Sequence, residues 1–270
     1  MLELCNVSKT FHAGTTNEVL SLQNVSLSIK DGCFVSVIGT NGSGKSTLLN
    51  AVAGGFFIDS GSIHLGGRDV TRWPEHRRAE FIGRVFQNPF SGTAPTMSIA
   101  ENLSLAARRG RVRGLSPALA AGWMGELHDR VRVLNMGLEN RLANAIGTLS
   151  GGERQALTLL MATWLRPDIL LLDEHTAALD PKSADKVIRV SEDIIAREKL
   201  TALMVTHSMP QAARLGDRLI MMHRGRIIHH FNGAEKQRLR PHDLLAHFEE
   251  LRRGEQLDET AADMLKRTYV

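Results

Sequence analysis

The sequence runs Phe34-Val35-Ser36-Val37-Ile38-Gly39-Thr40-Asn41-Gly42-Ser43-Gly44-Lys45-Ser46-Thr47, an apolar run directly followed by a glycine-rich loop. The loop matches the pattern G-x-x-x-x-G-K-[ST] at every fixed position. Glycines let backbone N–H groups converge on phosphate oxygens, and a following helix adds the partial positive charge of its N-terminus. The residues after the loop are compatible with such a helix. The stretch therefore predicts a buried strand, a phosphate-binding loop (P-loop) and a helix, in that order.

The side chains of this loop have predicted roles in binding ATP. Lys45 is placed to reach the β- and γ-phosphates as a point charge, and the Ser46 hydroxyl is placed to ligate Mg²⁺. The nucleotide-binding candidates in the loop are Gly39, Asn41, Gly42, Ser43, Gly44, Lys45, Ser46 and Thr47.

A second candidate element is the acidic end of an apolar run at 169–172, where Asp173 and Glu174 follow directly. A carboxylate at the carboxyl end of a parallel strand faces the same crevice as a P-loop. We expect Asp173 to hold Mg²⁺ and Glu174 to polarise the attacking water. Neighbouring side chains on a strand point to opposite faces, so both carboxylates serve one site only if the chain bends there.

A second glycine motif, Leu149-Ser150-Gly151-Gly152-Glu153-Arg154-Gln155, lies directly before a predicted helix. Its hydroxyl, its bare backbone N–H groups and the helix N-terminus resemble another anion cradle. P-loop folds use one such cradle per nucleotide, so the second one is predicted to serve a nucleotide held by another copy of the chain. We therefore expect a head-to-tail dimer with two ATP molecules between the protomers, and we expect Ser150, Gly151 and Gly152 to contact the partner's nucleotide.

The order of the remaining segments predicts the fold class: α/β, a P-loop NTPase core with a mostly parallel sheet. We expect an N-terminal antiparallel β subdomain, in which strands at 2–7 and 25–29 are joined by a loop at 13–17. A helical subdomain is expected as an insertion at about 88–147. The predicted boundaries are one ATPase domain at 1–240 and a C-terminal helical tail at 241–270. The predicted helices are Lys45–Ala53, Ile99–Arg108, Ala118–Asn135, Glu153–Leu165 and Lys182–Glu198.

Composition limits the partners. No apolar run approaches the ~18 residues that span a bilayer, and the N-terminus has no secretory pattern, so any membrane role is expected to depend on a partner. The net charge is +4, which is too small to predict nucleic-acid binding. The basic run at 108–113 has two interpretations: a solvated connector, or a contact with a membrane surface or an acidic partner loop.

The P-loop, the motif at 149–155 and Asp173-Glu174 together resemble the ATPases of ABC transporters in order and spacing, over roughly residues 1–235. The resemblance implies further roles. Gln87 would touch Mg²⁺ or water and sense the transporter partner, and Asp180 would act across the dimer. His207 would contact the γ-phosphate. Phe11 would stack on adenine, although an aromatic residue at this position also fits a packing role.

The sequence departs from the family pattern at His175, where a small residue or proline usually follows the glutamate. A histidine beside Glu174 could tune the pH dependence of catalysis. Alternatively, it is a tolerated substitution that points away from the site.

Two classes of ABC ATPase compete. DNA-repair members carry long coiled-coil insertions and translation members carry two cassettes, but this chain has one cassette and no heptad array. The class that drives a membrane transporter is therefore favoured, with permease subunits as partners and a peripheral location on the cytoplasmic face of the inner (cell) membrane.

The segments 83–102 and 2–24 look similar to ATPases that are paired with permeases of the branched-chain-amino-acid type. Such systems import amino acids or similar small solutes delivered by an extracytoplasmic binding protein. The alternative within transporters is an export or lipoprotein-release ATPase.

Overall fold

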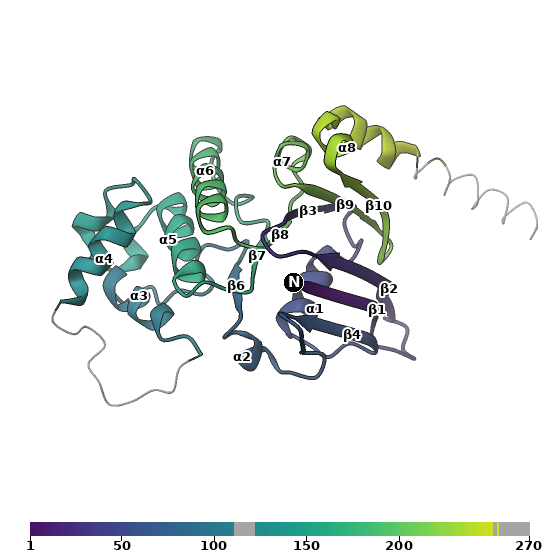
Figure 1. Cartoon of the computed structure of the whole chain (residues 1–270), viewed down its shortest axis with the longest axis horizontal. Helices are drawn as coiled ribbons and strands as arrows, with labels where there is room; N and C mark the ends of the chain where they lie inside the picture. Colours follow the sequence, from purple (N-terminus) through teal and green to yellow (C-terminus); the bar gives the residue numbers. More distant parts are fainter. Residues whose placement is uncertain (111–121, 251–252, 254–270) are drawn as a thin grey trace, which may run out of the picture.

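The computed structural model describes residues 1–110, 122–250 and 253. A six-stranded sheet crosses the middle of the molecule (Figure 1), and it is parallel except for its outer strand β10. The strand order is β10 (Arg226–Asn232), β9 (Arg218–His223), β3 (Phe34–Gly39), β8 (Ala202–Val205), β7 (Ile169–Asp173) and β6 (Ile82–Val85). This confirms the predicted mostly parallel sheet.

A second, antiparallel sheet contains the N-terminal strands in the order β2 (Val19–Ile29), β1 (Leu2–Phe11), β4 (Ser60–Leu65) and β5 (Arg68–Asp69). The strand predicted to end at Val7 continues to Phe11. The pairing register between β1 and β2 shifts several times after Leu4. These irregularities break the alternation of buried and exposed residues, so the sequence pattern located only the first half of the strand.

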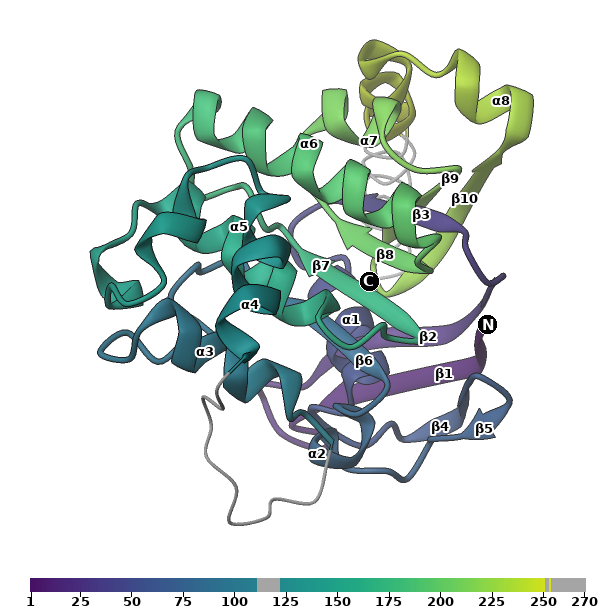
Figure 2. The same ribbon diagram turned by 60° about the vertical axis from the view of Figure 1, so that its left-hand side comes forward.

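Helices cover both faces of the large sheet. Helix α1 (Lys45–Ala53) lies between the two sheets (Figure 2), where its apolar residues share one core with both of them. Helices α5 (Gly151–Thr163) and α6 (Pro181–Glu198) pack on the opposite face. Alternate residues of β3 point to these two cores: Val35 and Val37 belong to the α1 side and Phe34 belongs to the other. Every residue of β3 is buried, which explains why the strand is apolar apart from Ser36, whose hydroxyl donates to the Leu215 carbonyl at 3.0 Å.

The inserted helices form one end of the molecule (Figure 1). They are α3 (Ile99–Ala107), α4 (Trp123–Arg132) and the 3₁₀ turns η1 (Leu138–Arg141) and η2 (Ile146–Thr148), and they share a core with α5. Of the helix predicted at 118–135, residues 118–121 lie outside the described residues. In the basic run, Arg109 donates to the carbonyl oxygens of Ala162 and Leu165 at 3.2 Å. It anchors the end of α3, so a purely solvated connector is wrong for this residue; residues 111–113 lie outside the described residues.

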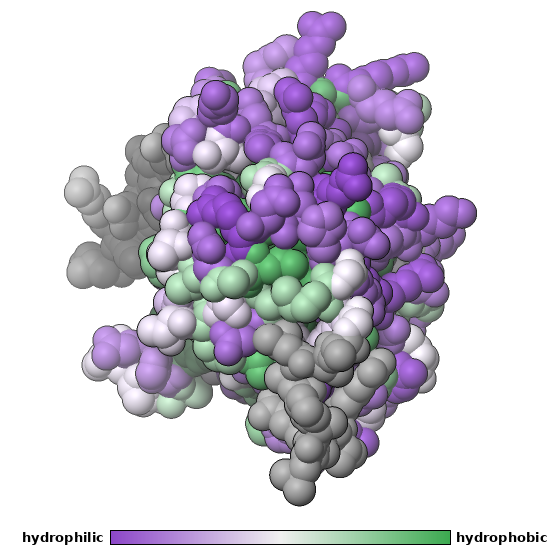
Figure 3. All heavy atoms as spheres, turned by 90° about the vertical axis from the view of Figure 1, so that its left-hand side faces the viewer, coloured by the Kyte–Doolittle hydropathy of each residue, from purple (hydrophilic) through white to green (hydrophobic). Residues whose placement is uncertain are grey.

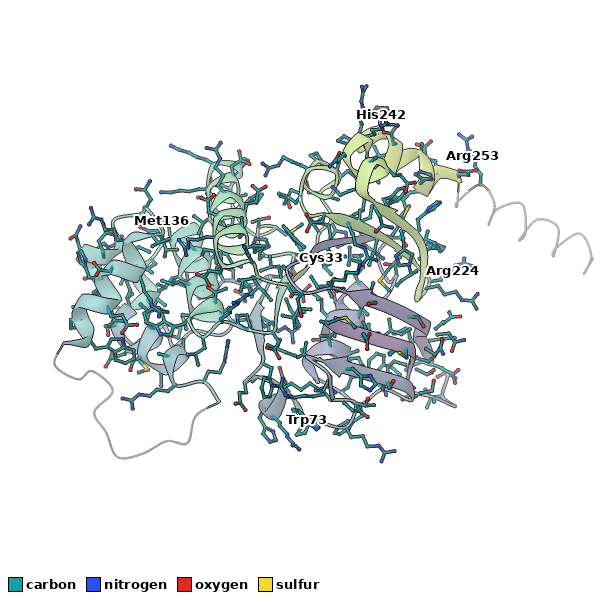
Figure 4. The ribbon with its side chains drawn as sticks, in the orientation of Figure 1. Cys33, Trp73, Met136, Arg224, His242 and Arg253 are labelled. Carbon is teal, nitrogen blue, oxygen red and sulfur yellow. The ribbon has the colours of Figure 1, made fainter. Side chains whose placement is uncertain are left out.

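The opposite end of the molecule contains α7 (Met209–Arg214), α8 (Gly233–Arg238) and a helix at 241–250. Figure 4 shows this separation: His242 and Arg253 lie at one end and Met136, beyond α4, lies at the other. Leu244 and Phe248 are buried against Ile38 and Met221, whereas Leu245 is half exposed. Of the tail predicted at 241–270, residues 251–252 and 254–270 lie outside the described residues. Each helix in the described part of the chain is too short or too polar to span a bilayer.

Candidate active site

The carboxyl ends of three adjacent strands meet at one edge of the large sheet. Strand β8 lies between β3 and β7, and the register pairs Val205 with both Val37 and Asp173. The Thr206 N–H donates to the Val37 carbonyl at 3.1 Å, and the Glu174 N–H donates to the Val205 carbonyl at 3.0 Å. The P-loop, the Asp173-Glu174 pair and His207 therefore leave the sheet at the same level.

The P-loop has the conformation that its glycines predict. Gly44 has φ 95°, and a Cβ at this position would lie 2.4 Å from the Ser21 carbonyl oxygen, so no other residue fits. The buried Lys45 Nζ donates to the carbonyl oxygens of Gly39 and Thr40, both at 2.9 Å. Burial lowers the pKa of Lys45, and the negative charges of Glu174 and Asp173 oppose this shift. The lysine thus lies in the field of both carboxylates.

The first turn of helix α1 has backbone N–H groups that no capping side chain among the described residues satisfies. Among the described residues, no side chain caps its N-terminus, and its first turn contains no acidic residue. Ser46 is exposed in this first turn, and the buried Ser43 Oγ has no hydrogen-bond partner in the described part of the chain. An uncapped helix start with an orphaned hydroxyl fits an anionic ligand such as the phosphates of ATP.

The acidic pair is bent as the sequence requires. Glu174 has φ 45°, a left-handed conformation that is rare for a residue with a side chain. This bend turns Glu174 so that its Oε1 lies 2.6 Å from His207 Nε2. Burial raises the pKa of Asp173, while the nearby charges of Arg84 and Lys45 lower it and that of Glu174 raises it. The bend that both carboxylates need if they are to serve one site is therefore present, and their roles there stay predictions.

His175 points away from this site. Its ring is buried, and its Nε2 lies 3.1 Å from Ser191 Oγ on α6. Ser191 donates its own proton to the Val187 carbonyl at 2.9 Å, so the histidine Nε2–H must be the donor to Ser191. Burial lowers the pKa of His175 from 6.5 to about 4. His175 is therefore a neutral packing residue near neutral pH, in agreement with the second of the two interpretations.

Gln87 is exposed two residues beyond β6. The position of this strand end is fixed by Gln155, a buried residue of α5 that the sequence analysis gave no role. The Gln155 Nε2 donates to the Phe86 carbonyl oxygen at 2.9 Å. The second glycine motif is thus connected through its helix to the residue just before Gln87.

The second glycine motif begins α5 with a capping box. Ser150 Oγ accepts from the Glu153 N–H at 3.3 Å, and the Glu153 carboxylate accepts from the Ser150 N–H at 2.8 Å. Gly152 lies so close to the start of α6 that an added Cβ would be 2.9 Å from the Ser183 Cβ. Asp180 caps α6 by accepting from the Ser183 N–H at 3.0 Å, and the hydrogen bonds from Ser183 lower the pKa of Asp180.

Apart from Gln87 and Phe11, the predicted site residues therefore fall into two groups. The P-loop, Asp173, Glu174 and His207 form one group, and Ser150, Gly151, Gly152 and Asp180 form the other. Within the described residues, no hydrogen bond or ion pair directly joins the two groups.

Phe11 is the last residue of β1 and is half buried. Its ring packs edge-on against Phe56 with a centroid distance of 5.1 Å, and Lys9 Nζ lies 5.5 Å from its centroid. These contacts give Phe11 a packing role, and its role toward adenine stays a prediction.

Two functional candidates were missed by the sequence analysis. Gln211 accepts from Thr206 Oγ1 at 3.0 Å and donates to Thr176 Oγ1 at 3.4 Å, so it ties the residue before His207 to the segment after Glu174. Arg84 forms an ion pair with Asp173, with 3.7 Å between Nη2 and Oδ2. The sequence did contain a signal for Arg84, because it is a charged residue within the otherwise apolar run Ile82–Val85.

Two cavities adjoin the site. One of about 580 Å³ is bordered by Gly39, Thr40, Asn41 and His207 and by Leu245, Phe248 and Glu249 of the helix at 241–250. The other, of about 600 Å³, lies between the sheet and the inserted helices. Its lining includes Arg84, the loop residues Gly92, Thr93 and Ala94, and Leu105 of α3.

A phosphate-binding loop beside two carboxylates and a histidine, at the carboxyl edge of a parallel sheet, defines a P-loop ATPase. The chain belongs to the ABC transporter family: the family model with that description matches residues 22–177. A tyrosine transport ATP-binding protein of Clostridioides difficile (strain R20291) is 41% identical over 92% of this chain and 99% of its own length. The thiamine import ATP-binding protein ThiQ of Escherichia coli (strain K12) is 37% identical over 75% of this chain and 82% of its own length.

Solved structures show the same relationship. A dimeric ATP-binding cassette in a post-hydrolysis state, bound to ADP and phosphate, superposes with a TM-score of 0.72 and 28% identity, covering 85% of this chain and 97% of that one. An ATP-binding cassette in its ADP conformation gives a TM-score of 0.73 at 26% identity, covering 87% and 92%. The chain is thus the ATP-binding and ATP-hydrolysing subunit of an ABC transporter.

Proposed function

We propose that this subunit hydrolyses Mg²⁺-bound ATP with the residues gathered at the sheet edge. The donor set fits Mg²⁺, because the Ser46 hydroxyl, the Asp173 carboxylate and the Gln87 amide supply hard oxygen ligands. Bound Mg²⁺ would neutralise charge on the phosphates. The residues Gly39 to Thr47 would hold the phosphates through backbone N–H groups and the Lys45 ammonium, and Phe11 would contact the adenine.

The side chains beyond the loop would act on the attacking water. Glu174 would accept its hydrogen bond and orient it toward the γ-phosphate, while His207 holds the Glu174 carboxylate and reaches the same phosphate. The 2.6 Å contact between His207 and Glu174 supports this pairing. It is the single observation that carries the catalytic assignment.

The nucleotide-binding site is proposed to be completed by a second copy of the chain. Ser150, Gly151 and Gly152 form an independent helix N-terminus, and Asp180 lies beside them at the start of α6. In a head-to-tail dimer, this group would close on ATP held by the partner's P-loop. The solved structure of a similar cassette, which is dimeric and bound to ADP and phosphate, supports such an arrangement.

The permease is proposed to dock on the groove between the sheet and the inserted helices, at the loop that follows Gln87. This end of the molecule shows an apolar area surrounded by hydrophilic atoms (Figure 3). Leu105, which lines the cavity of about 600 Å³, is 48% exposed, and Phe90 in the loop is 57% exposed. Exposed apolar side chains of this size around a groove are typical of a protein interface.

The transported solute is proposed to be an amino acid or a similar small solute that is taken up. The similarity to thiamine and methionine import subunits, together with that to a tyrosine transport subunit, favours uptake over the export or lipoprotein-release alternative. The ATPase domain would extend over residues 1–240, with 241–270 as its helical tail. It would lie on the cytoplasmic face of the inner (cell) membrane, and an extracytoplasmic solute-binding protein would act through the permease.

The test is Glu174→Gln. The variant keeps the hydrogen-bonding shape but loses the charge that activates water, so it should bind ATP, lose turnover by about 10²-fold or more and accumulate an ATP-dependent dimer. Phosphate release and size-exclusion chromatography measure the two effects. Glu192→Gln, which removes an ion pair between α6 and Arg214 of α7 and no predicted site residue, is the matched control and should behave like the wild type. Normal turnover of Glu174→Gln would remove Glu174 from the mechanism.

A further inference from the structure

Arg84 is a charged residue within the buried strand β6, and its guanidinium group connects several elements of the active site. Its Nη2 donates to Asn50 Oδ1 on α1 at 2.6 Å and lies 3.7 Å from the Asp173 Oδ2 at the end of β7. Its Cζ lies 4.6 Å from the centre of the Phe86 ring, next to Gln87. One side chain thus touches the helix after the P-loop, the acidic strand end and the loop that leads to the inserted helices.

Other arginines with buried guanidinium groups have a different kind of partner. Arg78 donates to the carbonyl oxygens of Ala51, Val52, Thr71 and Trp73. Arg109 donates to the carbonyl oxygens of Ala162 and Leu165. Such bonds fix the backbone and serve the fold. Arg84 instead contacts side chains, and two of these belong to elements that carry the predicted Mg²⁺ ligands.

The helical spacing explains why the contact with Asn50 matters. Asn50 follows Ser46 by four positions in α1, so both side chains lie on the same face of the helix, one turn apart. Arg84 therefore holds the face of α1 that carries the Ser46 hydroxyl. Through its other contact, it holds the Asp173 carboxylate.

We propose that Arg84 is a positioning residue that keeps Ser46 and Asp173 at the separation needed for one divalent cation. This inference rests on the proposed function, which assigns these two residues to Mg²⁺. Side chains that hold metal ligands from behind set the direction of the ligand oxygens, and their loss commonly weakens metal binding by about 10- to 100-fold. Arg84 also lines the cavity of about 600 Å³, so a partner in that groove would touch the residue that orients the metal ligands.

The test measures metal binding without turnover. Mn²⁺ replaces Mg²⁺, the protein is saturated with a non-hydrolysable ATP analogue, and free Mn²⁺ is followed by electron paramagnetic resonance. Arg84→Gln should weaken Mn²⁺ binding by about tenfold, while the affinity for a fluorescent ATP analogue in EDTA stays within about twofold of the wild type. Arg84→Lys keeps a charge near Asp173 but loses the simultaneous contact of Nη2 with Asn50 and Asp173, so it should recover part of the affinity.

Two further variants separate the possible outcomes. Arg109→Gln removes an arginine from the wall of the same cavity and should leave Mn²⁺ affinity unchanged. Asp173→Asn removes the proposed ligand itself and should weaken Mn²⁺ binding more than Arg84→Gln does. If Asp173→Asn weakens binding and Arg84→Gln does not, the role of Arg84 is refuted and the metal site stands. If Asp173→Asn binds Mn²⁺ normally, the proposed metal site is refuted.

Thermal unfolding checks that each variant is folded. If Arg84→Gln does not fold, Asn50→Ala breaks the contact with α1 and leaves the ion pair between Arg84 and Asp173 in place. It should weaken Mn²⁺ binding several-fold. Wild-type Mn²⁺ affinity in Asn50→Ala and in Arg84→Lys would then overturn the proposal.

Discussion

Helices α1 and α5 both begin with glycine and serine residues, but their first turns differ. Helix α1 follows Gly44, and within the described residues no side chain caps it and no acidic residue lies in its first turn. Helix α5 begins with Ser150 and Glu153, which satisfy two backbone N–H groups between them. The carboxylate of Glu153 also lies at the positive end of the helix dipole, where it is paired with Arg141 at 2.8 Å.

The comparison shows that a glycine-rich helix start is not sufficient to bind phosphate strongly. The start of α1 offers unpaired donors and the Lys45 ammonium, so it can hold the phosphates by itself. The start of α5 is already partly satisfied and partly neutralised, so it should add a contact only to a nucleotide that is bound elsewhere. This difference is the physical reason to assign α1 to primary binding and α5 to closure of a dimer.

The largest expected effect is on the amount of ATP trapped in the dimer, when Lys45→Ala is placed in one copy of the chain and Ser150→Ala in the other. In the Glu174→Gln background, Lys45→Ala should trap no ATP because both sites lack the lysine, and Ser150→Ala should trap none because both sites lack the serine. A one-to-one mixture forms heterodimers with one intact site, so trapping should return to roughly a quarter of the Glu174→Gln level. Filter binding of radioactive ATP measures the trapped fraction.

Trapping by Ser150→Ala alone would contradict the assignment of α5 to the partner's nucleotide. Mixing should have no effect when both variants carry the same defect, which supplies the control. If the mixture traps no ATP although cross-linking shows heterodimers, the two helix starts do not serve one nucleotide.

An intermediate effect is expected at His175, which joins the acidic strand end to α6, the helix that contacts Gly152. The folded state keeps His175 neutral down to a pKa of about 4, whereas the unfolded chain takes up a proton below 6.5. Its stabilisation is therefore present above pH 6.5 and is lost as the pH falls toward 4. Between pH 7.5 and pH 5, the free energy of unfolding of His175→Gln should therefore fall by roughly 2 kcal/mol less than that of the wild type.

Urea unfolding at the two pH values measures this difference. His242→Gln, at an exposed histidine of the tail helix, is the control and should keep the acid sensitivity of the wild type. Equal acid sensitivity of His175→Gln and the wild type would contradict the neutral, buried state of His175.

The smallest expected effect is on the free energy of unfolding, and it distinguishes the capping role of Ser150 from its contact with phosphate. Helix α3 begins with the same capping box, in which Ser98 pairs with Glu101. Ser98→Ala and Ser150→Ala should each cost about 1 kcal/mol of unfolding free energy in the absence of nucleotide. Only Ser150→Ala should lose ATP-dependent dimer formation. If both variants lose it equally, the effect at Ser150 comes from helix stability and not from the nucleotide.

Local patterns predicted the elements well where they depend on neighbouring residues. The helix predicted at Lys45–Ala53 is α1 with the same bounds, and the predicted helix at 182–198 differs from α6 by one residue. The N-terminal strand was located only in part because the register shifts in β1 interrupt its alternation. The individual roles of the candidate site residues stay predictions, although the structure gathers the P-loop, Asp173, Glu174 and His207 at one edge.

The sequence by itself determined the P-loop, the acidic strand end and the second glycine motif, because each is a short segment whose residues specify its own hydrogen bonds and backbone angles. Only the tertiary structure decided which distant residues meet. It placed Arg84 between Asn50 and Asp173, turned His175 toward Ser191, and packed the helix at 241–250 beside the P-loop. These contacts depend on strand order and helix packing across long sequence separations, and no local spacing encodes them.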